Sequence, residues 1–133
     1  IMIVDDDDVD RYMASYVMKK AGFVKEISEF ETGTDALAYL QRNDGSPEML
    51  PQVILLDINM PRMSGFEFLD KLSDLPGFSA ARCCIFMHTS SMHPEDQKRA
   101  TDNPFVYGFI VKPIEKNRLA DIRQAYLASR HTS

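Results

Sequence analysis

Five short apolar blocks recur along the chain, and each has the length and residue types of a β-strand. The block at 53–56 is apolar at four consecutive positions, which is typical of a strand buried on both faces of a parallel sheet. The block at 23–30 is more polar and suits the edge of a sheet. In chain order the predicted strands are residues 1–4, 23–30, 53–56, 83–87 and 106–111.

The segment after the first block has apolar residues at the three- and four-residue spacing of an amphipathic helix. We predict that this helix has Asp7 or Asp8 as its N-cap and stops at Gly22. Such a helix normally packs on a sheet through its apolar face. The predicted face consists of Val9, Tyr12, Met13, Tyr16 and Val17.

Four further helices follow from the same spacing. Thr34 is predicted to cap the second helix, and Pro94 suits the first position of the fourth, which runs to about Asp102. The residues expected on the apolar sides of the second, third and fifth helices are Ala36, Leu37, Leu40, Phe66, Leu69, Leu72, Leu119, Ile122 and Tyr126.

Strands that alternate with helices predict an α/β fold, with a doubly wound, five-stranded parallel sheet and helices on both faces. With 133 residues and 44% hydrophobic content, residues 1–133 are expected to form one domain. No apolar stretch approaches the roughly 18 residues of a membrane span, and the adjacent Cys83 and Cys84 suit a reducing compartment. We therefore expect a cytoplasmic protein without a membrane partner, and the net charge of −5 argues against direct binding of nucleic acid.

Polar residues stand where the predicted strands end. Asp5 and Asp6 follow the first strand, Asp57 the third, Thr89 the fourth and Lys112 the fifth. Because ligands bind parallel α/β sheets outside the carboxyl ends of the strands, we expect these residues to meet at one edge. Carboxylates gathered there would repel one another unless a cation such as Mg²⁺ were bound. Asp57 is then the natural nucleophile for a phosphoryl group, whose oxygens Thr89 and Lys112 could hold.

These residues, in this order and spacing, resemble the receiver domain of two-component response regulators over essentially the whole chain. The matching segments are Ile3-Val4-Asp5-Asp6, Leu56-Asp57-Ile58-Asn59-Met60-Pro61, Ser64-Gly65, Thr89-Ser90 and Phe109-Ile110-Val111-Lys112-Pro113. The resemblance implies the flavodoxin-like strand order 2-1-3-4-5. It also implies that Asp57 accepts a phosphoryl group from a histidine kinase or a histidine phosphotransfer protein.

The resemblance further implies a role for each neighbour of Asp57. Asp6 would bind Mg²⁺ directly and Asp5 mainly through water, with Asp57 and the backbone carbonyl of Asn59 as further ligands. Lys112 would pair with Asp57 or with its phosphate, and the bond from Lys112 to the following proline would be cis.

Two more residues would carry the signal to the surface. Thr89 would move its hydroxyl to the phosphate, and Phe109 would turn inward behind it. Asn59 and Ser91 would tune the rate of dephosphorylation. The implied output is contact with a downstream protein through the fourth helix, fifth strand and fifth helix, and a phosphorylation-dependent homodimer is a further expectation.

The domain would be a stand-alone receiver or one excised from a longer protein, and not an enzyme beyond its own phosphoryl transfer and autodephosphorylation. Other functions fit the residues less well. A calcium loop starting at Asp6 would need a glycine and a final acid where Arg11 and Val17 stand. A haloacid-dehalogenase-like phosphatase would need a second acid where the chain has Asn59. The other alternative is a pseudo-receiver, a binding module that works without phosphorylation, and the intact acids, threonine and lysine count against it.

Overall fold

The computed structural model describes the chain except for residues 23–25, 44–48, 76–82, 91–92 and 132–133. The described part contains five strands that alternate with five helices, as predicted. The strands are β1 (Met2–Val4), β2 (Ser28–Phe30), β3 (Val53–Leu56), β4 (Cys84–Thr89) and β5 (Val106–Val111), and the helices are α1 (Asp8–Lys20), α2 (Gly33–Arg42), α3 (Gly65–Ser73), α4 (Pro94–Asp102) and α5 (Arg118–His131). None of these helices has the length and apolar character needed to cross a membrane.

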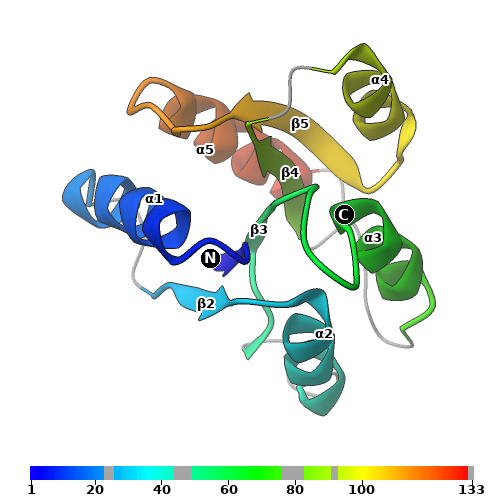
Figure 1. The fold of residues 1–133 in the computed structure, drawn as a ribbon. Coiled ribbons are helices and arrows are strands. Elements are labelled where there is room, and N and C mark those ends of the chain that lie inside the picture. The colour runs from blue at the N-terminus through cyan, green and yellow to red at the C-terminus, as the bar shows by residue number, and fades with distance from the viewer. Residues whose placement is uncertain (23–25, 44–48, 76–82, 91–92, 132–133) are drawn as a thin grey trace.

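The strands form one parallel sheet in the order β2-β1-β3-β4-β5 (Figure 1). This confirms the flavodoxin-like order. The register pairs Val4 with Leu56 and Leu56 with Met87, so the carboxyl ends of the three central strands lie almost level. Residues that directly follow β1 and β3 are therefore neighbours in space, although about fifty positions separate them in the sequence.

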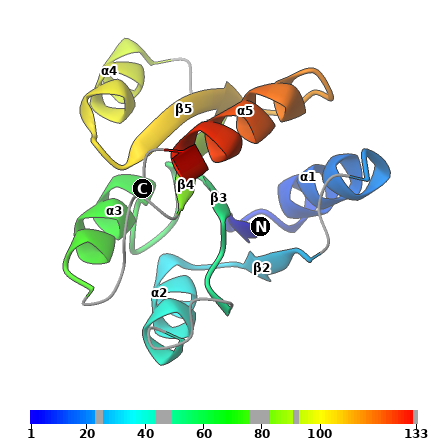
Figure 2. The ribbon, with the colours of Figure 1, turned by 180° about the vertical axis from the view of Figure 1, so that it is seen from behind.

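Helices cover both faces of the sheet, with α1 and α5 on one side and α2, α3 and α4 on the other (Figures 1 and 2). Every residue of β3 and β4 is buried, because these central strands have a helical layer on each face. Each layer closes its own hydrophobic core. The helical residues at the centre of the two cores are Ala36, Leu40, Phe68, Leu69, Leu72 and Ala100 on one face and Ala14, Met18, Leu119 and Ile122 on the other.

The prediction for the packing face of α1 was wrong except at Val17, which is half-buried and packs against the core on this side of the sheet. Tyr12 is 68% exposed, and Val9, Met13 and Tyr16 also lie largely in solvent. The helix instead packs on the sheet through its buried residues, which are Ala14, Ser15 and Met18. Two of these three side chains are small, and the larger apolar residues lie on the outer side. There Tyr12 and Tyr16 stack on each other with ring centroids 6.4 Å apart.

Helix caps follow the predictions with one exception. Asp7 caps α1, because its carboxylate accepts hydrogen bonds from the backbone N–H groups of Val9 and Asp10. The N-cap of α2 is Thr32, not Thr34. Thr32 has an extended backbone and its hydroxyl oxygen accepts the N–H of Asp35 at 3.0 Å, whereas Thr34 lies inside the first turn of the helix. β4 also extends two residues beyond the predicted end at Met87, to include Thr89.

The start of α3 lies directly against the end of β3. The N–H of Gly65 donates to the carbonyl of Ile58 at 2.8 Å, and the backbone of Asp57 occupies the space that a Gly65 side chain would need. We therefore predict that Gly65→Ala lowers the free energy of unfolding by about 1–3 kcal/mol through overpacking.

Urea denaturation at neutral pH measures this loss. Gly22→Ala is the control, since Gly22 has a positive φ of 71° but no atom within 4 Å of the added methyl group. Its free energy of unfolding should fall only by the cost of backbone strain, about 1–2 kcal/mol. A Gly65 variant as stable as the unchanged protein would contradict the steric argument.

Candidate functional site

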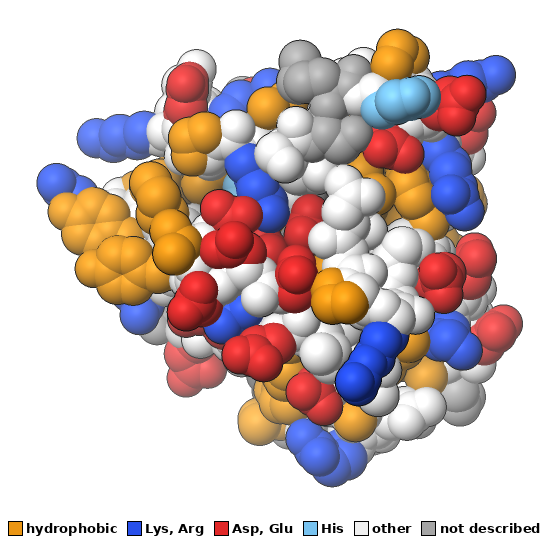
Figure 3. Space-filling model, in the orientation of Figure 1, with side chains coloured by type: hydrophobic (Ala, Val, Ile, Leu, Met, Phe, Trp, Pro, Cys, Tyr) orange, Lys and Arg blue, Asp and Glu red, His pale blue; other side chains and the backbone are white. Residues whose placement is uncertain are grey.

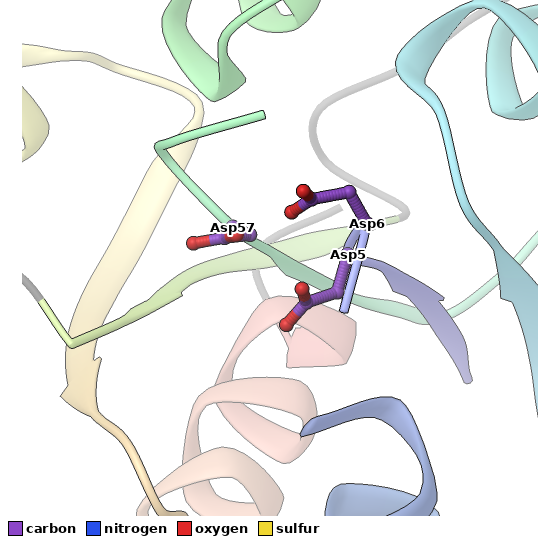
Figure 4. A group of neighbouring side chains, drawn as sticks. All are labelled: Asp5, Asp6 and Asp57. Carbon is purple, nitrogen blue, oxygen red and sulfur yellow. The ribbon is translucent and has the colours of Figure 1, made fainter. Parts of the chain in front are cut away.

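Asp5, Asp6 and Asp57 lie side by side where β1 and β3 end (Figure 4). The N–H of Asp57 donates to the carbonyl of Val4 at 2.9 Å, so strand pairing continues one residue beyond β3 and fixes the backbone of Asp57. The N–H of Asp5 donates to the carbonyl of Phe30 at 3.0 Å and continues the pairing of β1 with β2 in the same way. The sheet itself therefore sets the spacing of these acids.

The three carboxylates each offer an oxygen within 4.8 Å of the others. Asp5 and Asp57 are only 1% and 5% exposed, whereas Asp6 is exposed. An all-oxygen donor set that is buried on one side and open to water on the other suits Mg²⁺, which keeps several of its water ligands. Two ionised acids buried this closely are costly without a counter-charge, so the donor set fits a divalent cation.

Lys112 brings a positive charge to the same group of acids. Its Nζ lies 2.7 Å from Oδ2 of Asp5, 2.8 Å from Oδ2 of Asp10 and 3.5 Å from Oδ2 of Asp57, and its side chain is only 9% exposed. In Figure 3 acidic side chains gather in the middle of the face, with basic side chains among them. One lysine charge does not balance the acids that surround it.

Burial and neighbouring charges shift the pKa values of Asp57 and Lys112. Burial and the charge of Asp5 raise the pKa of Asp57 to about 7, although Lys112 and the backbone N–H of Asn59 act in the opposite direction. Burial would lower the pKa of Lys112, but the contacts with Asp10, Asp5 and Asp57 outweigh it and raise that pKa above its usual range. Lys112 is therefore charged at neutral pH, while Asp57 is divided between its two protonation states.

Thr89 and Lys112 are held beside each other by the pairing of β4 with β5. Thr89 is fully buried at the end of β4, and its carbonyl accepts the N–H of Lys112 at 2.9 Å. The peptide bond between Lys112 and Pro113 is cis, as the resemblance implied.

The other residues singled out from the sequence lie around this edge. Phe109 is half-buried on β5, where it packs against the core on the α4 side of the sheet. Asn59 is exposed two residues after Asp57. Ser91 lies outside the described residues.

Two residues near the site were missed from the sequence. Asp10 contacts Lys112 from the first turn of α1. Arg11 donates a hydrogen bond to the carbonyl of Asp5 at 2.6 Å and lies 3.7 Å and 3.6 Å from Glu29 and Glu31. The sequence held only a partial signal, because Asp7 as N-cap places both residues in the first turn of the helix that follows β1, where Asp8 also lies.

Comparison with known proteins identifies a family for this arrangement. A family model for the response regulator receiver domain matches residues 1–124. The probable methanogenesis regulatory protein FilR2 of Methanothrix harundinacea is 26% identical over 131 residues, which cover 96% of this chain and 83% of that protein. Hybrid signal transduction histidine kinase L of Dictyostelium discoideum is 30% identical over 127 residues, which cover 95% of this chain but only 7% of the kinase.

Solved structures agree with this assignment. A two-component response regulator from Cytophaga hutchinsonii superposes with a TM-score of 0.89 at 25% identity and covers 96% of this chain and 95% of its own. A response regulator receiver protein from Dyadobacter fermentans gives a TM-score of 0.82 at 28% identity, with 95% of each chain covered. The fold, the group of three acids at its carboxyl edge and the family match together show that the chain belongs to the receiver domains of two-component response regulators.

Proposed function

We propose that this receiver domain takes a phosphoryl group onto Asp57 and thereby switches a protein-binding surface. The observation that carries the proposal is the group of three carboxylates within 4.8 Å, with Lys112 3.5 Å from Asp57. Asp57 is the acceptor because it is the acid that stands alone directly after β3. Asp5 and Asp6 share the end of β1 and are the natural metal holders.

The transfer is a displacement at phosphorus. A carboxylate oxygen of Asp57 forms the new O–P bond while the N–P bond of a phosphohistidine breaks, and the leaving imidazole nitrogen keeps the electron pair and takes up a proton. Asp57 must be ionised to attack. Lys112 supports this state from 3.5 Å, while burial and Asp5 oppose it. The acceptor is thus held between its two protonation states until more positive charge arrives.

The residues that would hold Mg²⁺ are Asp5, Asp6, Asp57 and the backbone carbonyl of Asn59. When bound, the ion supplies positive charge that stabilises the developing charge on the phosphoryl oxygens. Asp57 then remains ionised despite its burial. Asn59 and Ser91 are proposed to tune how long the phosphoryl group survives, because they follow the acceptor and Thr89 closely in the sequence.

The signal leaves the site through Thr89, Phe109 and Lys112. Thr89 is buried at the end of β4, and Phe109 is only half-buried on the adjacent strand. When the hydroxyl moves to the phosphate, the ring would turn from this partly exposed position inward. Exposed Tyr107 and Val111 flank Phe109 on β5. The surface of α4, β5 and α5 is therefore the proposed contact for a downstream protein or for a second phosphorylated copy.

The proposed phosphodonor is a histidine kinase or a histidine phosphotransfer protein, and the proposed compartment is the cytoplasm. Residues 1–133 would act as a single signalling domain whose only chemistry is its own phosphorylation and autodephosphorylation. A pseudo-receiver shares the fold, so the first experiment is one that separates the two.

Incubation with acetyl phosphate and Mg²⁺ should add one phosphoryl group, because a small-molecule donor tests the acceptor without its partner protein. Intact-mass measurement detects the adduct. The adduct should be absent in Asp57→Asn and in chelator. An unmodified mass would favour a pseudo-receiver, and steady release of phosphate from many monoesters would favour a phosphatase.

Lys112→Ala should still accept the phosphoryl group but should lose the link between phosphorylation and partner affinity, because the lysine is the cation that holds the phosphoryl oxygens. The measurement compares binding of the downstream partner with and without acetyl phosphate. Lys116→Ala, at an exposed lysine beyond the strand end, is the matched control. Phosphate-dependent binding that survives in Lys112→Ala would show that the coupling runs elsewhere.

Stability without divalent ions should depend on pH through Asp57. Its folded pKa of about 7 lies above the usual value near 3.9 for an unfolded chain, so this group stabilises the fold below about pH 4 and its contribution is lost as pH rises through 7. Between pH 5 and pH 8 the unchanged protein should lose on the order of 2 kcal/mol relative to Asp57→Asn.

Urea denaturation in chelator at several pH values measures the difference. Asp70→Asn, at an exposed acid on α3, is the control. Its free energy of unfolding should change with pH in the same way as that of the unchanged protein. Saturating Mg²⁺ should flatten the pH dependence, since the ion binds the ionised form of the acids. Equal slopes for the unchanged protein and Asp57→Asn in chelator would mean that Asp57 is not perturbed.

A further inference from the structure

Lys112 is shared among three carboxylates, and Asp57 is the most distant of them. The lysine Nζ lies 2.8 Å from Asp10 and donates a hydrogen bond to it, and it lies 2.7 Å from Asp5. The distance to Asp57 is 3.5 Å. The lysine therefore makes its two short contacts away from the residue that is proposed to be phosphorylated.

Asp10 reaches the lysine because of the way α1 begins. Asp7 caps the helix and accepts the N–H of Asp10 at 3.0 Å, so Asp10 lies in the first turn of the helix, where its carboxylate reaches Lys112 just after β5. The side chain of Asp10 is 37% exposed, and that of Lys112 is 9% exposed. The ion pair therefore links a partly exposed acid to a buried lysine that follows it by 102 positions in the sequence.

We propose that Asp10 is a positioning residue that holds Lys112 back from Asp57 until a phosphoryl group competes for the lysine. This inference rests on the proposed function and adds to it a residue outside the group of three acids. In the unphosphorylated protein Lys112 stays on Asp5 and Asp10. When phosphoryl oxygens appear on Asp57, the ammonium group moves to them and its contact with Asp10 is given up.

The contact between Asp10 and Lys112 would therefore make the phosphorylated state less favourable. Each phosphoryl group gained must outcompete the Asp10 carboxylate for one ammonium group, and an unpaired Asp10 then adds a negative charge near the anion. Both effects oppose the phosphorylated state, so removing the Asp10 charge should favour that state. A partly exposed ion pair is worth roughly a fivefold change in affinity.

Beryllofluoride, which mimics a phosphoryl group on a carboxylate without a covalent step, tests the inference. Calorimetric titration in saturating Mg²⁺ should give about fivefold tighter binding for Asp10→Asn than for the unchanged protein. Asp8→Asn is the matched control, because Asp8 is an exposed acid in the same helical turn and its loss makes the same change in net charge. Asp10→Glu should bind the mimic about as tightly as the unchanged protein does, since it keeps a carboxylate within reach of the lysine.

Three outcomes are decisive. If Asp10→Asn binds no more tightly than Asp8→Asn, general charge accounts for the effect and the positioning role is overturned. Weaker binding by Asp10→Asn would also overturn it, since Asp10 would then assist the phosphorylated state. If the unchanged protein fails to bind the mimic at all, the proposed function fails and not this inference alone.

A second measurement follows the lysine directly. In a crystal structure of the unchanged protein with beryllofluoride and Mg²⁺, Lys112 Nζ should contact a fluoride and should lie beyond 4 Å, the limit of a salt bridge, from Asp10. A lysine that contacts the fluoride and still keeps its hydrogen bond to Asp10 would overturn the competition between the two.

Discussion

Repulsion among carboxylates at one edge of the sheet is the constraint on which the rest of this structure depends. Asp5 and Asp57 are almost fully buried and close enough to share one cation, and the pKa of Asp57 rises to about 7 as a result. A fold selected for stability alone would replace such a pair by apolar residues. The acids are tolerable because Lys112 offsets part of their charge, and the pocket can accept more positive charge from solution.

The scaffold holds these acids in place by backbone contacts that tolerate little change. Strand pairing fixes Asp5 and Asp57 through their own N–H groups, and Gly65 lets α3 begin against the carbonyl of Asp57. Lys112 is held in turn by the carbonyl of Thr89. Asp5, Asp57, Thr89 and Lys112 thus belong to one edge of the sheet that is held by backbone hydrogen bonds.

Sequence patterns predicted the sheet and the acid pocket well because both depend on short-range rules. An apolar run that ends in a polar residue places that residue at the carboxyl edge, whatever the details of packing, and Asp57 and Lys112 were found in this way. The orientation of α1 could not be predicted from such a short-range rule. Periodicity marked the face with Tyr12 and Tyr16, but the side that is buried carries Ala14, Ser15 and Met18, two of which are too small or polar to stand out in an apolar pattern.

Asp10 shows a second limit of reading the sequence one residue at a time. As one acid in an acidic segment it is indistinguishable from Asp8, and only the position of Lys112, 102 residues later, separates them. The position of Lys112 matters because several acids share this one lysine. When the lysine moves, the cost depends on which acid loses its contact. Asp5 is buried and would be costly to leave unpaired, whereas Asp10 can be hydrated once it is released. Asp10, the partly exposed partner, is therefore the acid that can give up the lysine at the smaller cost.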